Sequence, residues 1–327
     1  MGVFTALGDA DLAELATVFD LGEVTRWSAI AAGTINTNIR IETARGTYFL
    51  RLNEGKAEAD VAWEARLITA LAAAGVPTPP PITAKDGRPY AECRRKWASA
   101  FPWREGHHIS ADHVTPELAR TFGAALGQLH RAGAELPQAW RRGSIYDFDH
   151  LATRFDRCAR VDDKALTYAL AIIREELAVA KAAKAVRAAA THGIIHGDLF
   201  RDNVLWASAA ATDNAAISAI LDFEQASGGS LVYDLAVCIN DWCYTIYPRI
   251  DLAAALVEGY RSVRELTPTD RAALPIEIRA AATRFTLTRI TDVYLARVDN
   301  PEKDFRAFLA RCEAWRGPAL GQLTAVL

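Results

Sequence analysis

The sequence predicts an α+β fold with two lobes, a small antiparallel β lobe followed by a larger, mainly helical lobe. Short strand-like segments separated by glycine turns occupy much of the first hundred residues, whereas helical spacing dominates after Gly106. A chain of 327 residues, 51% of them hydrophobic, can bury a large core in two lobes. We therefore expect an N-terminal lobe at residues 1–99, a hinge at 100–106 and a C-terminal lobe at 107–327.

The N-terminal lobe is expected to contain two helices and an antiparallel sheet. Residues 8–19 and 58–74 carry apolar side chains at helical spacing. A further strand is expected from Trp97 into the hinge, and the pair Asp86-Gly87 predicts a hairpin turn before it. Three segments separated by glycine turns have the composition of strands, at residues 24–30, 37–43 and 47–52.

The chain beyond Gly106 is expected to be mainly helical. Thr115-Pro116 supplies an N-cap and a first-turn proline for a helix that ends near Gly133, and His130 near its end is expected to cap or pack. Further helices are expected at 148–190, which holds two, and at 251–264, 270–298 and 301–316.

A polar loop between apolar segments carries the main candidates for chemistry. It runs from His196 to Asn203, and the segments beside it predict two strands that present the loop at their mouth. Asp198 and Asn203 are five residues apart, and an apolar hairpin ends at Asp222, nineteen residues after Asn203. The sequence therefore predicts three oxygen ligands that converge from two strand ends.

Phosphoryl transfer requires such a set of groups. A carboxylate must orient the nucleophilic hydroxyl, and the Mg²⁺ ions on the phosphates of ATP prefer carboxylate and amide oxygens. Asp198 is the candidate to orient the acceptor hydroxyl and accept its proton, and Asn203 and Asp222 are the candidates to hold Mg²⁺. Asp and Asn also form ordinary turns, but the preceding histidine, the flanking strands and the pair Asp222-Phe223 favour the chemical interpretation.

The loop also resembles those of known enzymes. The order H-x-D-x-x-x-x-N followed by D-F is similar to the catalytic and metal-binding loops of the protein-kinase-like fold. HGDLFRDNVLW and YDLAVCINDWC resemble the type II homoserine kinases, a branch of the aminoglycoside and choline phosphotransferase superfamily. The resemblance extends over nearly the whole chain and is strongest in residues 195–243.

This resemblance implies a two-lobed protein-kinase-like fold and a kinase of threonine biosynthesis. Such an enzyme transfers the γ-phosphate of ATP, with Mg²⁺, to the hydroxyl of L-homoserine. Members of the family carry an aromatic-rich stretch after the metal-binding Asp-Phe, whereas this chain has Glu-Gln-Ala-Ser-Gly-Gly at residues 224–229. Within that segment, Gly228-Gly229 is expected to form a flexible bend.

The resemblance places the nucleotide on the N-terminal lobe. The loop 33–38, with Gly33 and Asn36, lies where this fold covers the ATP phosphates, although an ordinary hairpin turn explains its single glycine equally well. Arg51 occupies the third-strand position where many kinases have a lysine that contacts the α and β phosphates. Its guanidinium can bind phosphate oxygens, and an exposed strand arginine is the alternative.

Two further features complete the expected nucleotide site. Glu64 is expected to pair with Arg51, with Glu58 as its rival, and either could be a solvated surface charge. The backbone of the hinge at Ala100 and Phe101 is expected to bind adenine, a contact that requires no particular side chain.

Residues near the polar loop are candidates for binding the acceptor or supporting the loop. Arg201 could bind the transferring phosphate or a substrate carboxylate. The carboxylate of Asp241 suits a bound ammonium group of the substrate. Surface or packing roles are the alternatives for these residues. His196 is expected to pack and hydrogen-bond, and Asp234 to brace the catalytic loop through backbone hydrogen bonds. The acceptor candidates are Arg201, Asp202, Asp241 and Trp242.

Charge and composition exclude several classes of partner. A net charge of −3 gives no basic surface for nucleic acid. No apolar run reaches the roughly 18 residues that span a membrane, and the first residues do not resemble a signal peptide, so we expect a cytoplasmic protein without a membrane partner. The five scattered cysteines predict reduced thiols, and Cys238 and Cys243 are expected to pack rather than bind metal.

Two alternatives to a homoserine kinase are open at this point. One is a kinase of another small alcohol, such as choline, ethanolamine, an aminoglycoside or a sugar. The other is a catalytically silent nucleotide-binding protein, although the presence of Asp198, Asn203 and Asp222 argues against it. The acceptor is thus expected to be a small hydroxylated molecule.

Overall fold

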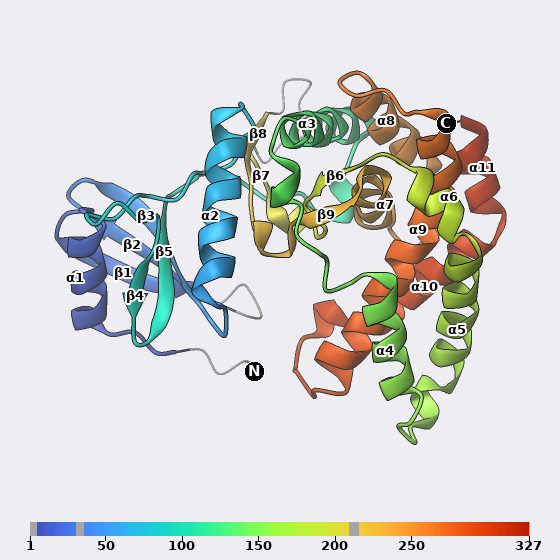
Figure 1. The fold of residues 1–327 in the computed structure, drawn as a ribbon, viewed down its shortest axis with the longest axis horizontal. Coiled ribbons are helices and arrows are strands. Elements are labelled where there is room, and N and C mark those ends of the chain that lie inside the picture. Colours follow the sequence, from blue (N-terminus) through green and yellow to red (C-terminus); the bar gives the residue numbers. More distant parts are fainter. Residues whose placement is uncertain (1–4, 31–35, 209–215, 327) are drawn as a thin grey trace. The chain divides into compact units, whose positions relative to one another are not determined.

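The computed structural model describes residues 5–30, 36–208 and 216–326, and the chain divides into two compact units (Figure 1). The first unit contains Met1–Gly106 and Ser218–Glu224, and the second contains His107–Ile217 and Gln225–Leu327. A short segment from far downstream therefore belongs to the first unit and brings Asp222 with it.

The first unit is built on an antiparallel sheet with the strand order β1-β2-β3-β5-β4. Two helices accompany the sheet, α1 (Asp9–Val18) and α2 (Glu58–Ala73). Ile41 and Leu50 lie in one core with Leu12 of α1, because alternate strand residues point to the same face. The strands are β1 (Val24–Ile30), β2 (Thr37–Thr43), β3 (Gly46–Asn53), β4 (Ala91–Cys93) and β5 (Lys96–Pro102).

The hairpin predicted at Asp86-Gly87 is wrong: these residues form a turn, whereas the hairpin joins β4 to β5. Its connection is Arg94-Arg95, with φ angles of 51° and 59°. This left-handed backbone is uncommon for residues other than glycine. The guanidinium of Arg94 binds both carboxylate oxygens of Asp11, at 2.6 and 2.9 Å. A contact with α1, distant in the sequence, therefore stabilises the turn.

The second unit is mainly helical. α7 lies at its centre, and every residue of α7 except Tyr233 is buried. α9 ends at Arg289, earlier than the sequence predicts, and passes into a π-helical turn at Ile290–Tyr294. The helices are α3 (Pro116–Ala134), α4 (Phe148–Cys158), α5 (Thr167–Ala182), α6 (Lys184–Ala189), α7 (Leu231–Trp242), α8 (Ile250–Arg261), α9 (Pro268–Arg289), α10 (Phe305–Arg316) and α11 (Pro318–Val326).

The strands of the polar-loop region correct a second prediction. The bend expected at Gly228-Gly229 is wrong, because both residues belong to a strand that pairs antiparallel with β6. A Cβ atom at Gly229 would lie 2.5 Å from Ile195 Cδ1, so this glycine permits close packing rather than flexibility. The strands are β6 (His192–Ile195), β7 (Val204–Trp206), β8 (Ile217–Ile220) and β9 (Ser227–Ser230).

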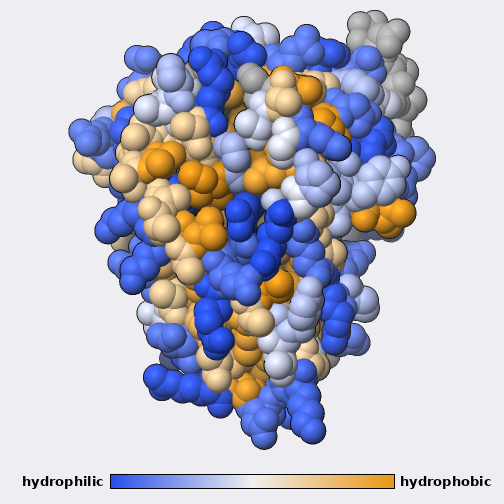
Figure 2. Space-filling model, turned by 90° about the vertical axis from the view of Figure 1, so that its right-hand side faces the viewer, coloured by the Kyte–Doolittle hydropathy of each residue, from blue (hydrophilic) through white to orange (hydrophobic). Residues whose placement is uncertain are grey.

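The surface of the second unit is mostly polar on the side that carries α5, α6 and α11. Hydrophilic side chains predominate there, with hydrophobic ones between them (Figure 2). Among the described residues, no helix combines the length and the apolar composition required to cross a membrane.

Candidate active site

A cluster of charged side chains joins β3 and α2 of the first unit to its downstream segment. Arg51 Nη1 lies 3.3 Å from Glu64 Oε1 and 3.3 Å from Asp222 Oδ1. Lys56 Nζ lies 3.0 Å from Glu64 Oε2 and 3.1 Å from Glu224 Oε2. Three carboxylates therefore surround two cations. The sequence analysis did not assign Lys56 or Glu224 to this site, because only the folded chain brings them to Arg51 and Glu64.

The local sequence explains why Arg51 meets Glu64. Leu50 points into the core, so the alternation of β3 turns Arg51 to the opposite face. Glu64 lies on the buried side of α2, whereas its rival Glu58 accepts a hydrogen bond from the Tyr90 hydroxyl at 3.1 Å. Burial alone would lower the pKa of the Arg51 guanidinium, but the adjacent carboxylates raise it above the ordinary value.

Asp222 adopts a strained backbone conformation in this cluster. Its φ angle is 64°, in the left-handed region that favours glycine. Its buried Oδ1 atom lies 3.3 Å from Arg51 Nη1, outside good hydrogen-bond geometry, and receives no other hydrogen bond within the described part of the chain. Carboxylate oxygens are ligands that hard divalent cations prefer. Asp222 therefore suits a bound cation.

Of the other residues predicted to contact the nucleotide, Asn36 contacts this cluster, whereas Ala100 and Phe101 belong to a strand. Asn36 Nδ2 donates to Glu224 Oε2 at 2.8 Å. Ala100 and Phe101 lie within β5, where they pair with β3. Gly33 lies outside the described residues.

In the second unit, a buried carboxylate braces the polar loop. Asp234, in the first turn of α7, accepts the backbone N–H groups of His196 at 2.6 Å and Gly197 at 2.7 Å. His130 Nε2 lies 3.1 Å from Asp234, and its other ring nitrogen lies 2.8 Å from the Tyr260 hydroxyl. Burial alone would raise the pKa of Asp234, but the hydrogen bonds with His130 and the loop lower it. His130, expected to cap or pack, is part of this network.

Asp198 lies in the braced loop with its side chain one-third exposed. Arg284 Nη1 lies 3.4 Å from Asp198 Oδ1 and 3.3 Å from the Gly197 carbonyl oxygen. Asn203 Nδ2 donates to the Asp198 carbonyl at 2.8 Å, which leaves the Asn203 amide oxygen for another partner. The loop therefore presents one carboxylate oxygen held by a cation and a second oxygen available to a ligand.

The sequence analysis missed Arg284. This arginine is buried on α9, and its guanidinium lies 4.0 Å from the centre of the Tyr146 ring and 3.8 Å from that of Phe285. A lone arginine in the otherwise uncharged stretch of residues 280–288 was the available signal, because arginine is rarely buried without a partner.

The acceptor candidates occupy three different environments. Asp241 accepts the backbone N–H of Arg201 at 2.8 Å and its side-chain Nε at 3.0 Å, so this pair joins the loop to α7. Asp202 is exposed as a residue. Desolvation of its carboxyl group, followed by the charges of Asp241 and Asp198, raises its pKa. Trp242 is fully buried, which is the packed alternative for this residue.

Trp242 and the neighbouring cysteines have packing roles. The Trp242 ring stacks on Phe122 with centroids 4.0 Å apart, and its Nε1 donates to the Leu199 carbonyl at 3.3 Å. Cys238 and Cys243 are buried free thiols, and burial raises the pKa of both. Within the described residues, no three His, Cys, Asp or Glu side chains gather as a metal site.

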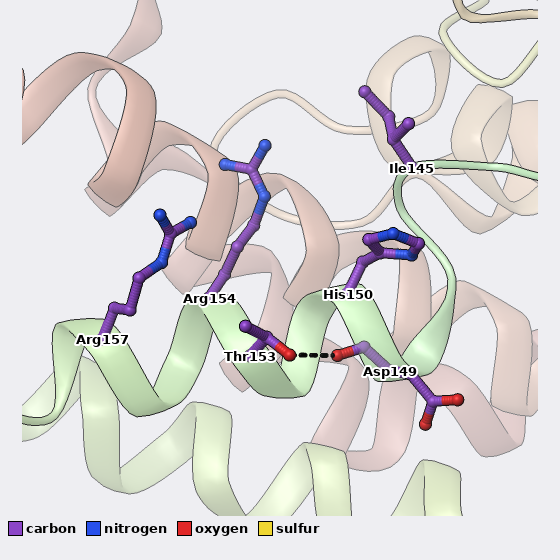
Figure 3. A pocket seen from close by; sticks show the side chains of 6 residues that line it. All are labelled: Ile145, Asp149, His150, Thr153, Arg154 and Arg157. Carbon is purple, nitrogen blue, oxygen red and sulfur yellow. Dashed lines mark hydrogen bonds between the residues drawn. The ribbon is translucent and has the colours of Figure 1, made fainter.

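A hollow of about 450 Å³ lies along α4 of the second unit (Figure 3). Arg154, on its wall, binds Asp292 Oδ1 at 2.6 Å and the Thr291 hydroxyl at 2.7 Å. The charge of this arginine is therefore already balanced. The lining residues are Ile145, Asp149, His150, Thr153, Arg154 and Arg157.

The chain matches the model of the phosphotransferase enzyme family over residues 26–266, about three quarters of its length, and it belongs to that family. It is 32% identical to a homoserine kinase of Parvibaculum lavamentivorans over 98% of this chain and 97% of that protein. It is 34% identical to a homoserine kinase of Methylobacterium radiotolerans over 89% of this chain and 88% of that protein.

Solved structures agree with the fold. An amicoumacin kinase, determined with AMP-PNP and Ca²⁺, superposes with a TM-score of 0.73 at 14% identity and covers 95% of this chain and 94% of its own. At this identity the likeness concerns the fold alone. The α+β fold with a small antiparallel sheet and a mainly helical remainder, predicted from the sequence, is confirmed.

Proposed function

We propose that this chain is a homoserine kinase, which transfers the γ-phosphate of ATP to the hydroxyl of L-homoserine. The observation that carries the proposal is the similarity, over nearly the whole chain, to relatives named homoserine kinase. The presence of Asp198, Asn203 and Asp222 is consistent with this chemistry, because the reaction requires a carboxylate base and oxygen ligands for the metal.

Asp198 is the proposed catalytic residue. Its carboxylate orients the homoserine hydroxyl and accepts the proton as the oxygen attacks the γ-phosphorus. Arg284 engages Oδ1, which leaves the other carboxylate oxygen for the substrate. Asp234 holds the backbone before Asp198, so the carboxylate is fixed in position before substrate arrives.

The charged cluster of the first unit is the proposed site for the nucleotide phosphates. Arg51 is charged, is held by Glu64 and can donate to phosphate oxygens. Mg²⁺ prefers hard oxygen ligands. Asp222 offers a buried carboxylate oxygen, and Asn203 offers its amide oxygen. Mg²⁺, when bound, would neutralise charge on the phosphates.

ADP release measured against a panel of alcohols tests this proposal. L-Homoserine is expected to give the highest kcat/KM, above choline, ethanolamine, an aminoglycoside and simple sugars. A preference for any of those acceptors would replace homoserine, and ATP binding without turnover on any acceptor would indicate a silent protein.

The Asp198→Asn variant tests the role of the proposed base. We expect kcat to fall by about 10²–10⁴-fold, because general-base catalysis contributes that much and asparagine cannot accept the proton. The thermal unfolding midpoint and the affinity for ATP should change little. Near-normal turnover of this variant would refute the assignment.

A further inference from the structure

We propose that Arg289 binds the α-carboxylate of the amino-acid acceptor. This inference rests on the proposed function, because it requires an acceptor that carries a carboxylate. It assigns a recognition residue that the sequence analysis did not consider.

Arg289 is the last residue of α9, and it donates hydrogen bonds to backbone oxygens. Its Nη1 donates to two backbone carbonyl oxygens, those of Asp304 at 3.2 Å and Glu302 at 3.5 Å. Its guanidinium lies over the ring of Phe308, 4.4 Å from the centroid. Among the described residues, no carboxylate forms an ion pair with it, and its side chain is only partly covered. The guanidinium therefore has capacity for another acceptor.

Four other covered arginines of the second unit have an acidic partner. Arg311 resembles Arg289 in donating to backbone carbonyl oxygens, those of Asn240 and Ala307, but it is buried, whereas Arg289 is partly exposed. Burial, followed by the nearby charge of Arg311, lowers the pKa of Arg289 to about 10, as expected for a desolvated cation without a counter-ion. A ligand carboxylate would supply that counter-ion. The paired examples are Arg187 with Glu277, Arg264 with Asp270, Arg279 with Glu176 and Arg284 with Asp198.

The position of Arg289 matches the proposed chemistry. The negative charges of Asp241, Asp198 and Asp202 raise the pKa of Arg289, although by less than burial lowers it. The ring of Phe200, two residues after Asp198, is 4.5 Å from Phe285 and 5.7 Å from Phe308, so the loop packs directly on the helices that carry Arg289 and its ring partner.

A zwitterionic acceptor requires a second charge. Asp202, four residues after Asp198, is exposed and makes no ion pair within the described residues. Its carboxylate is a suitable partner for an ammonium group. Arg289 and Asp202 are thus complementary to the two charged ends of an amino acid whose hydroxyl is at Asp198.

Arg154, in the hollow of Figure 3, is the rival site for the carboxylate. It is less suitable because Asp292 and Thr291 already satisfy its guanidinium, and a substrate would have to displace them. Arg289 needs no such exchange. The two residues can be separated by experiment.

The test compares L-homoserine with 3-aminopropan-1-ol (aminopropanol), which is homoserine without its carboxylate. In Arg289→Gln, kcat/KM for homoserine should fall by about 100-fold, mainly through KM, because a charged donor is lost. The preference for homoserine over aminopropanol should fall by at least about 30-fold. Arg289→Lys retains the positive charge, so its preference for homoserine should lie between those of the parent chain and Arg289→Gln. This variant keeps the test valid if Arg289→Gln is unstable.

Two controls decide the interpretation. Arg306→Gln removes an exposed arginine that pairs with Asp304, close in sequence, and should leave the preference unchanged. If Arg154→Gln rather than Arg289→Gln abolishes the preference, the inference is overturned in favour of the hollow. An active homoserine kinase whose preference survives both Arg289 substitutions refutes this inference alone, whereas a wild-type chain without activity on homoserine refutes the proposed function with it.

Discussion

Two arginines, one in each unit, lie in opposite charge environments. In the first unit, Arg51 and Lys56 are enclosed by Glu64, Asp222 and Glu224. In the second unit, Arg289 donates to backbone carbonyls and has no acidic partner among the described residues. The first cluster has one more negative than positive charge, which suits a nucleotide that arrives with its own metal cation. A guanidinium without an acidic partner suits a carboxylate that arrives without a cation.

The largest effect is expected from a substitution that changes the charge of the cluster around Arg51. Asp222→Asn removes a charged oxygen from the proposed metal site and one of the two carboxylates at Arg51. We expect at least about a 100-fold loss of turnover and a higher Mg²⁺ concentration for half-maximal rate. Turnover measured across a Mg²⁺ series provides the readout, with exposed Glu92→Gln as the matched control. An unchanged Mg²⁺ dependence would argue against a metal-binding role for Asp222.

A second prediction compares the two arginines directly. Arg51→Met leaves the one-third exposed Asp222 without its cation and leaves buried Glu64 with Lys56 alone, and the free energy of unfolding should fall by about 2 kcal/mol. Arg289→Met removes a cation that lacks an acidic partner and should change it by less than about 1 kcal/mol. Urea unfolding followed by circular dichroism measures both values. Equal losses would show that the two environments do not differ as described.

The smallest expected effect concerns acid stability of the second unit. Asp270 is buried, and although burial alone would raise its pKa, hydrogen bonds from Thr191 and Thr267 and the charge of Arg264 lower it. A carboxyl group with a lower pKa in the folded chain stabilises that state above its unfolded-chain pKa of about 3.9. Its contribution, on the order of 1 kcal/mol, is lost as the pH falls through the folded-state value.

Unfolding by urea at a series of pH values down to the acid range tests this expectation. Asp270→Asn should be less stable near neutral pH and should lose less stability on acidification than the parent chain. Exposed Asp162→Asn should behave as the parent does. A parallel pH dependence in Asp270→Asn and the parent would exclude Asp270 as the source.

Local sequence order was sufficient to predict several parts of this molecule. Periodicity predicted the strand around Arg51 and the helix of Glu64, and the resemblance to kinases made their pairing one of the expected alternatives. The spacing around Asp198 is a contiguous motif and can be identified in the same way. The roles of these residues as base, nucleotide ligand or metal ligand remain predictions.

Features that depend on distant segments could not be predicted. Arg94 lies in a left-handed hairpin connection and binds Asp11 of another element, and Gly229 belongs to a strand that packs closely against β6. Arg284 and Arg289 lie five residues apart on one helix. Arg284 pairs with Asp198, whereas Arg289 donates to backbone carbonyl oxygens. Whether an arginine has an acidic partner is a property of tertiary structure, and no periodicity in the sequence encodes it.

The free thiols provide a built-in reporter for each unit. Cys93 is half-buried in the first unit, whereas Cys158, Cys238, Cys243 and Cys312 are buried in the second. Burial raises the pKa of these thiols, so little reactive thiolate forms while the chain is closed. Chemical labelling should therefore modify Cys93 early and the other four when helices separate, so that mass spectrometry of a labelling time course would record the opening of each half of the molecule independently.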